Sequence, residues 1–188
     1  MLVPEGCFVE LIYCSERDLL IRSMRIDDAQ VIYDTLLSYG WHPSLAVYEN
    51  YYKEQIQGQR IVLVAVIRGE VAGYCNLLTS PKEGPWKGKT YPEISDLNVF
   101  RHFRRLGIAN KLLDMAEREA EKQADRVTLA VGLHWGYGAA QRIYAKRGYI
   151  PDGSGLWYNG KQLEEGAACL NDDGLLLYMS KRLGNIQK

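Results

Sequence analysis

The chain has 188 residues, enough for one domain with a substantial core, and Lys plus Arg equal Asp plus Glu at 23 each. This balance excludes a global electrostatic field suited to nucleic acid or an anionic membrane, so any anion site must be local. No stretch approaches the roughly 18 uninterrupted apolar residues of a membrane span, and the first residues lack the basic and apolar regions of a secretion signal. We therefore expect a cytoplasmic protein.

The cysteines and histidines give no metal-binding pattern. No Cys-x-x-Cys pair occurs, and the three histidines are scattered along the chain. We expect reduced thiols and no structural metal. The four cysteines are Cys7, Cys14, Cys75 and Cys169.

The beginning of the chain predicts two strands followed by two helices. Apolar runs at residues 7–13 and 19–24 are separated by a polar turn, and the first of them is an addition to the main pattern. Asp27 or Asp28 can cap a helix, and Ser44 can cap a second one, because apolar residues follow each at helical spacing.

The middle of the chain predicts a hairpin, a loop and a strand that leads into a helix. Residues 61–67 and 71–78 are β-branched or apolar runs joined by a short glycine-containing turn. Residues 81–89 have the composition of a loop. Residues 93–99 alternate as a strand, and a helical apolar period begins at Ile108.

The remainder predicts a strand at 126–131, a helix at 139–147 and strands at 155–158 and 175–179. The whole order is typical of an α/β protein built around a mixed sheet. The last two strands are joined by a polar connection that contains Glu164, Glu165, Asp172 and Asp173.

The strand-to-helix junction has the properties of a phosphate site. A helix start exposes about four main-chain N–H groups and the positive end of the helix dipole. Gly107 lets the main chain approach an anion closely, and Ala109 leaves room for it. We therefore predict a pyrophosphate site here, with long-range attraction from Arg101, Arg104 and Arg105. These arginines could equally form a solvated turn.

Two motifs carry a resemblance to a known family. Arg104-Arg-Leu-Gly107-Ile-Ala109 resembles the Q/R-x-x-G-x-G/A acetyl-coenzyme A motif of the GNAT N-acetyltransferases. The segment 137–149 resembles the later N-x-x-A-x-x-x-Y-x-x-x-G-F motif of the same family. The spacing of Ala140, Tyr144 and Gly148 is kept, whereas Tyr137 replaces the usual Asn and Tyr149 the usual Phe.

The resemblance implies a fold and a cofactor. The implied GNAT fold is a mixed, mostly antiparallel sheet of about six or seven strands with about four helices, splayed between its fourth and fifth strands. It would cover residues 19–183 of a single domain, 1–188, with an extra strand within 1–18. Acetyl-coenzyme A would be the acyl donor, and no metal would be needed. The implied cofactor-binding residues are Leu97, Asn98, Val99, Arg104, Arg105, Leu106, Gly107, Ile108, Ala109, Tyr137, Ala140 and Tyr144.

Acyl transfer to an amine requires a group that removes a proton. An alkyl amine of pKa about 10.4 is mostly protonated at neutral pH, a shortfall of roughly 4–5 kcal/mol. Glu93 lies fourteen positions before Gly107, which resembles the spacing of the carboxylate base in histone-modifying GNAT enzymes. His134 is the rival, because an imidazole titrates in the useful range. Alternatively, Glu93 could face solvent and His134 could be a hydrogen-bonded loop residue. Water is the third candidate for the base.

The resemblance also assigns a leaving-group residue and an acceptor region. Tyr144 resembles the family tyrosine that protonates the departing thiolate, although a tyrosine at helical spacing could simply belong to the core. Trp41 and His42 occur where relatives bind the acceptor, and Glu93 could contribute there. Cys75 has no context that suggests a covalent acyl-enzyme.

The sequence therefore predicts transfer of an acetyl group to a primary amine of a small molecule, by direct attack in a ternary complex. A protein or peptide acceptor, and an acyl-coenzyme A sensor without turnover, remain alternatives. No nucleic-acid or membrane partner is expected. The oligomeric state is left open, with a homodimer among the alternatives.

Overall fold

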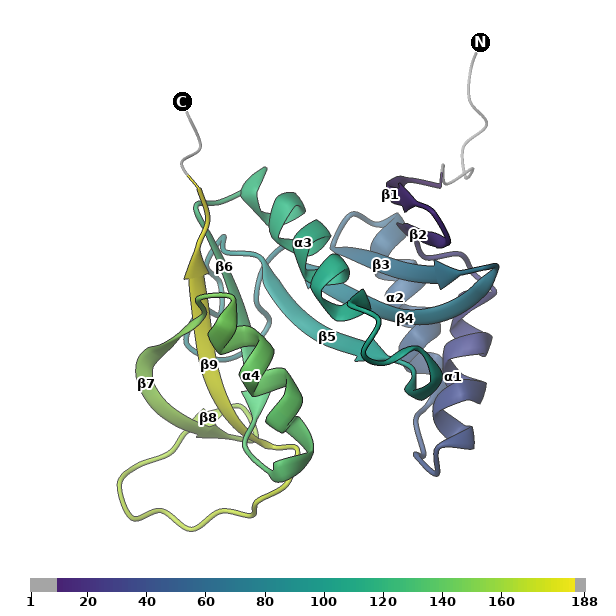
Figure 1. Ribbon diagram of the computed structural model, residues 1–188. Coiled ribbons are helices and arrows are strands. Elements are labelled where there is room, and N and C mark those ends of the chain that lie inside the picture. Colours follow the sequence, from purple (N-terminus) through teal and green to yellow (C-terminus); the bar gives the residue numbers. More distant parts are fainter. Residues whose placement is uncertain (1–9, 185–188) are drawn as a thin grey trace. The chain divides into compact units, whose positions relative to one another are not determined.

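The computed structural model describes residues 10–184, which contain four α-helices and nine strands (Figure 1). The helices are α1 (Asp28–Ser38), α2 (Leu45–Ile56), α3 (Ile108–Glu121) and α4 (Gly138–Lys146). The strands are β1 (Ile12–Glu16), β2 (Leu19–Ser23), β3 (Arg60–Ile67), β4 (Glu70–Leu78), β5 (Glu93–Val99), β6 (Arg126–Gly132), β7 (Ile150–Tyr158), β8 (Lys161–Gln162) and β9 (Leu175–Arg182).

The predicted order of helices and strands is confirmed, and the sheet is mixed and mostly antiparallel as expected. The predicted strand count was too low, because the two-residue β8 carries too little pattern to be recognised. The first predicted strand is displaced: β1 begins at Ile12, and residues 7–9 of the predicted run lie outside the described residues. Cys7 lies outside them too.

The chain divides into two compact units. Unit 1 consists of Met1–Asn76 and Asp96–Ala116, and unit 2 consists of Leu77–Ser95 and Glu117–Lys188. β4, β5 and α3 each continue from one unit into the other. None of the helices within residues 10–184 is long and apolar enough to cross a membrane.

Unit 1 is built around β3 and α1. β2 pairs antiparallel with β1 and with β3. Alternate residues of β3 and the i, i+3, i+7 residues of α1 point into one apolar cluster, which also contains Tyr48 and Tyr74. The turn between β3 and β4 uses Arg68 (φ 50°) and Gly69 (φ 88°), both left-handed, as a two-residue hairpin turn of the favoured hand requires. The buried side chains of β3 and α1 in this cluster are Val62, Val64, Val66, Ala29, Ile32 and Leu36.

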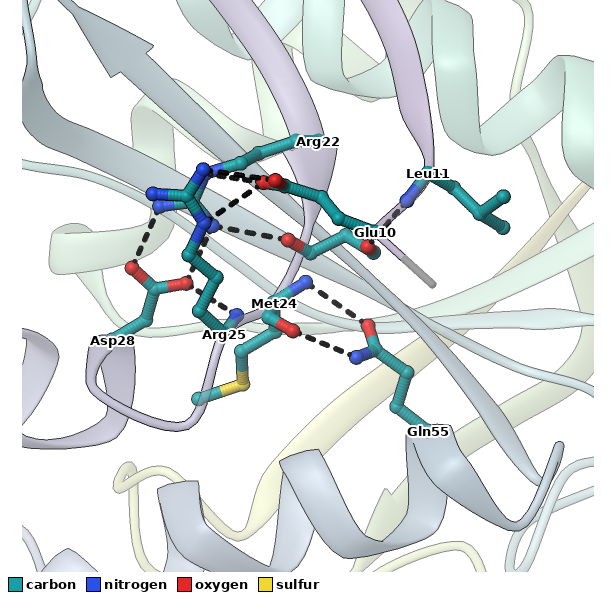
Figure 2. A network of polar contacts seen from close by, with 8 residues as sticks. Glu10, Leu11, Arg22, Met24, Arg25, Asp28 and Gln55 are labelled. Atoms are coloured by element: carbon teal, nitrogen blue, oxygen red, sulfur yellow. Dashed lines mark hydrogen bonds and ion pairs between the residues drawn. The ribbon is translucent and has the colours of Figure 1, made fainter. Parts of the chain in front are cut away.

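A polar network fixes the start of α1 against β2 (Figure 2). The Arg22 guanidinium, 4% exposed, donates to both oxygens of Asp28 at 2.6 and 2.9 Å. Asp28 also accepts from the Arg25 main-chain N–H at 2.7 Å. The Gln55 side chain exchanges two hydrogen bonds with the main chain of Met24, at 3.0 and 2.9 Å. The chain leaving β2 is therefore held by groups from α1 and α2.

The helix starts were predicted at the right positions but with the wrong capping groups. Asp27 and Ser44 precede α1 and α2, yet neither side chain accepts a capping hydrogen bond. Asp28, the first residue of α1, does not cap the helix either, because its carboxylate bonds to Arg22 and to the Arg25 N–H before the helix. The expected hydroxyl cap at Ser44 is wrong.

Unit 2 has the strand order β5 (its first residues), β6, β9, β7, β8. β6 pairs antiparallel with β9 along its whole length, and Figure 1 shows β9 between β6 and β7. In contrast, the parallel ladder between β5 and β6 comprises the pairs Glu93↔Thr128 and Ile94↔Leu129. The ladder stops early in β5, where the sequence predicts the two strands to splay.

Glu117 holds together three parts of unit 2. Its carboxylate accepts from Arg147 Nε and Nη2 at 2.9 and 2.8 Å, from Lys181 Nζ at 2.7 Å and from the Tyr149 hydroxyl at 3.1 Å. Burial acts to raise the pKa of Glu117, but the hydrogen bonds from Arg147 and Lys181 outweigh it, so the pKa is lowered. The end of α3, the turn after α4 and β9 are thereby joined through one charged group.

Glu117→Gln should lower the free energy of unfolding by about 1–3 kcal/mol at neutral pH, because it leaves two half-buried cations without their counter-charge. The stabilisation is present above the usual glutamate pKa and is lost as the pH falls through the lowered folded value. Urea unfolding at several pH values measures both effects. Glu119→Gln on the same helix removes only the exposed pair with Lys122 and should cost less than about 0.5 kcal/mol. Equal losses in the two variants would contradict this account.

Candidate functional site

The junction between β5 and α3 lies in unit 1 and turns through left-handed residues. After β5 a short 3-10 turn, η1 (Arg101–Phe103), precedes Arg105 at φ 66° and Gly107 at φ 81°. The Gly107 carbonyl accepts from the Lys111 N–H at 3.2 Å, so α3 begins here. A Cβ added at Gly107 would meet no atom within 4 Å. The space beside Gly107 at the helix start is therefore open, and a helix start with unpaired amides is where an anion can bind.

The arginines near this junction are partly committed to other groups. The Arg101 N–H donates to the Tyr39 hydroxyl at 3.0 Å, and its guanidinium lies 4.3 Å above the Tyr39 ring. Arg104 Nε donates to the Val99 carbonyl at 3.0 Å, and Lys111 pairs with Glu16 at 2.8 Å. These contacts stabilise the turn itself. An anion here would be held by the amides of the turn and helix start rather than by these side chains.

The end of β5 runs very close to β4. A Cβ on Gly73 would lie 2.4 Å from the Asn98 carbonyl oxygen, so only glycine fits there. Leu97, Asn98 and Val99 are half-buried. Their predicted role depends on their main-chain groups, which this close approach holds in place.

Glu93 lies in unit 2 as the first residue of β5, beside Thr128 of β6. It is half-buried. Burial, followed by the negative charges of Glu93, Glu83 and Asp152, raises the pKa of Tyr178 to about 12. Tyr178 also packs edge-on against Trp86 and Trp157. Glu93 therefore belongs to an aromatic and acidic part of unit 2.

His134 uses both ring nitrogens within unit 2. Nδ1 accepts from the Gly136 N–H at 3.0 Å, so Nε2 carries the proton and donates to Asp173 Oδ1, also at 3.0 Å. The Tyr137 hydroxyl donates to the same Asp173 oxygen at 3.0 Å, and its ring lies 4.7 Å from that of His134. To act as a base, His134 would have to give up the Gly136 hydrogen bond.

Tyr144 and Ala140 lie on α4 in unit 2, at the spacing that the motif predicts. Tyr144 is 6% exposed and contacts Tyr149 edge-to-face, with ring centroids 5.7 Å apart. Trp41 and His42 lie in unit 1, in the exposed connection between α1 and α2. The predicted site residues thus fall into two groups. Unit 1 contains the helix-start residues, Trp41 and His42. Unit 2 contains Glu93, His134, Tyr137, Ala140 and Tyr144.

Comparison with known proteins agrees with this strand, turn and helix arrangement. The family model described as "Acetyltransferase (GNAT) domain" matches residues 40–162, well over half of the chain. The chain belongs to the GNAT acetyltransferase family. No curated protein sequence matches it significantly.

Solved GNAT structures share the fold at low sequence identity. Ribosomal-protein-alanine N-acetyltransferase from Brucella melitensis is 19% identical, with a TM-score of 0.65, covering 87% of this chain and 99% of that one. The putative acetyltransferase yncA from Salmonella typhimurium, solved with acetyl-CoA, is 17% identical, with a TM-score of 0.63 and coverages of 92% and 98%. Arabidopsis thaliana Naa50, in complex with the bisubstrate analogue CoA-Ac-MVNAL, is 16% identical, with a TM-score of 0.61 and coverages of 89% and 100%.

This GNAT protein is an acetyltransferase, for which acetyl-CoA is the implied donor. The residues present fit such a donor, because the start of α3 offers main-chain amides and Gly107 leaves open space before them. When bound, the donor supplies an activated acetyl thioester. Within residues 10–184 no three His, Cys, Asp or Glu side chains gather as metal ligands.

Asp96 of strand β5 was not among the site residues predicted from the sequence. Asp96, in unit 1, is half-buried and accepts hydrogen bonds at Oδ2 from the hydroxyls of Tyr74 (2.9 Å) and Tyr51 (3.2 Å). Burial raises the pKa of Asp96, and the two hydroxyls and Arg60 only partly oppose it. Its partners are 22 and 45 residues away along the chain, so no local pattern could reveal the cluster.

Asp96→Asn should make the GNAT protein more stable at neutral pH, by about 1 kcal/mol, because it removes a buried charge and keeps an oxygen for the tyrosines. The pKa of Asp96 is raised, so the folded wild type loses stability as the pH rises from the usual aspartate value toward the raised one. The advantage of the variant should grow over the same interval and then stay constant. Urea midpoints from acid to neutral pH measure it, and a destabilised Asp96→Asn variant at neutral pH would contradict the reasoning.

Proposed function

We propose that the protein transfers the acetyl group of acetyl-CoA to a primary amine of a small molecule by direct attack in a ternary complex. The observation that carries this proposal is the open, left-handed junction at Gly107, where main-chain donors precede α3. Direct attack requires only that the two substrates be held together, and this proximity supplies much of the rate.

The reaction needs one group that accepts a proton and one that returns it. Glu93 would accept the proton of the acceptor's ammonium, since it is a half-buried carboxylate on the strand that leads to the helix start. Tyr144 would give a proton to the departing thiolate. We rank His134 below Glu93, because both of its ring nitrogens are already in hydrogen bonds.

A peptide or protein amine is the second candidate acceptor. Two structural relatives are named as a ribosomal-protein-alanine N-acetyltransferase and as a protein bound to a bisubstrate analogue with a peptide portion. An assay that follows release of the coenzyme A thiol, with a panel of small amines beside a panel of peptides, separates the two acceptor classes.

Gly107→Glu should weaken acetyl-CoA binding about tenfold or more, because it places a carboxylate at the open position before α3 and strains a left-handed backbone. Calorimetric titration with acetyl-CoA measures the change. Gly166→Glu is the matched control, since Gly166 also has a positive φ and open space around it but lies in the connection between β8 and β9. Equal affinity in both variants and the wild type would remove the helix start from the proposal.

Glu93→Gln should lower kcat about a hundredfold at neutral pH, the order expected for loss of a general base. The deficit should shrink in alkali, where more of the acceptor is neutral without help. Glu83→Gln is the control, because Glu83 also places its charge near Tyr178. A ratio of variant to wild-type rates that stays constant across pH would speak against Glu93 as the base.

A further inference from the structure

Asp96 is a half-buried carboxylate without a counter-charge among the described residues. Among the described residues no Lys, Arg or His forms an ion pair with it, although Arg60 is near enough to influence its pKa. Arg60 is already bound to Glu54, with Nη2 and Nε at 2.7 and 2.8 Å from Oε2, and its guanidinium lies 4.3 Å above the Tyr51 ring. Buried charges in proteins are normally paired, so Asp96 is an exception that calls for a cation from elsewhere.

The second oxygen of Asp96 is available to such a cation. Both tyrosine hydroxyls donate to Oδ2, and within residues 10–184 no group donates to Oδ1. Asp96 is half-buried rather than enclosed. The two tyrosines hold the carboxylate in a fixed orientation and leave Oδ1 without a donor among the described residues.

Asn76 supplies a second polar group at the same place. Its side chain is 0% exposed, and neither its amide nitrogen nor its amide oxygen has a hydrogen-bond partner in the part of the chain that the structure describes. The Phe100 N–H donates to the Ala72 carbonyl at 2.9 Å, and continuing this antiparallel register places Asn76 opposite Asp96. Tyr74, two residues before Asn76 on β4, points to the same face and reaches Asp96.

We propose that the Asp96 carboxylate and the Asn76 amide bind the ammonium group of the amine acceptor. The ammonium would donate one hydrogen bond to Asp96 Oδ1 and one to Asn76 Oδ1, supplying the missing positive charge and pairing the orphaned amide oxygen. The half-buried Tyr51 on α2, whose hydroxyl bonds to Asp96, is the aromatic side chain that would lie beside the adjoining alkyl chain. This proposal rests on the proposed function, because it assigns that reaction an alkylammonium substrate.

The direct test uses a probe that needs no turnover. n-Butylammonium chloride is titrated into the full-length protein by calorimetry at constant ionic strength, with tetramethylammonium chloride as a cation that lacks N–H donors. Wild type should bind n-butylammonium in preference to tetramethylammonium. Asp96→Asn should weaken n-butylammonium binding about tenfold or more, the equivalent of one charged hydrogen bond.

Two further variants make the test specific. Asn76→Ala should weaken n-butylammonium binding several-fold without loss of folding, because it removes a buried amide that has no partner to lose. If Asp96→Asn does not fold, the effect of Asn76→Ala on n-butylammonium binding decides whether the proposed site exists. Asp172→Asn is the matched control, since Asp172 also accepts from a tyrosine hydroxyl, that of Tyr158 at 3.1 Å, but is exposed. Unchanged binding in both test variants would overturn the proposal and leave Asn76 as a site for a structural water.

Turnover then separates this proposal from the one on which it rests. If amines are acetylated and Asp96→Asn has the same KM for them as wild type, the ammonium site is wrong and the acetyl transfer stands. If n-butylammonium binding depends on Asp96 but no amine of the panel is acetylated, the site stands and the proposed function fails. Acetyl-CoA affinity should be equal in wild type and Asp96→Asn.

Discussion

The backbone reversal at Gly107 is the constraint on which the rest of this protein depends. A strand that ends at Val99 must become a helix that begins at Ile108, and the chain achieves this with one 3-10 turn and two left-handed residues. The left-handed conformation at Gly107 directs the first amides of α3 outward, and those amides have no partner inside their own helix. Gly107 leaves open space at this position, so that a bound anion could complete the hydrogen bonding of those amides.

Among the described residues, several ion pairs with buried members hold the fold, whereas Asp96 has no ion-pair partner. Arg22 with Asp28, Arg60 with Glu54, and Glu117 with Arg147 and Lys181 are all matched in sign and bonded through several atoms. The first two join consecutive elements through residues six positions apart, and the pairs of Glu117 join α3 to residues 30 and 64 positions later, so each has a structural role. Asp96 differs, because its hydrogen-bond partners are neutral hydroxyls and burial raises its pKa by disfavouring the charged carboxylate. Burying such a charge costs stability, which is tolerated most readily at a functional position.

The sequence allowed much of the fold to be predicted, because the fold depends on periodicity and on short motifs. The alternation at residues 93–99, the helical period from Ile108 and the glycine between them are all local signals. What could not be predicted depends on contacts between distant residues. The sequence makes His134 a candidate general base. In the fold its Nε2 proton is hydrogen-bonded to Asp173, 39 residues later. In the sequence, Asp96 cannot be told from any other polar strand residue. Its hydrogen bonds to Tyr51 of α2 and Tyr74 of β4 form only in the fold. The capping hydroxyl at Ser44 failed for the same reason, since side-chain direction is not determined by position alone.

Binding an ammonium and removing its proton make opposite demands on a carboxylate. An ion pair with Asp96 lowers the free energy of the charged amine and so raises its pKa, whereas a base must favour the neutral amine. A single nitrogen held firmly by Asp96 is therefore a poor nucleophile until it leaves the ion pair. An acceptor with two amino groups avoids this conflict, because one can remain charged beside Asp96 and Asn76 while the other is deprotonated and attacks. The same reasoning explains why one strand can contain two carboxylates, Glu93 and Asp96, without redundancy: one would exchange protons and the other would hold charge.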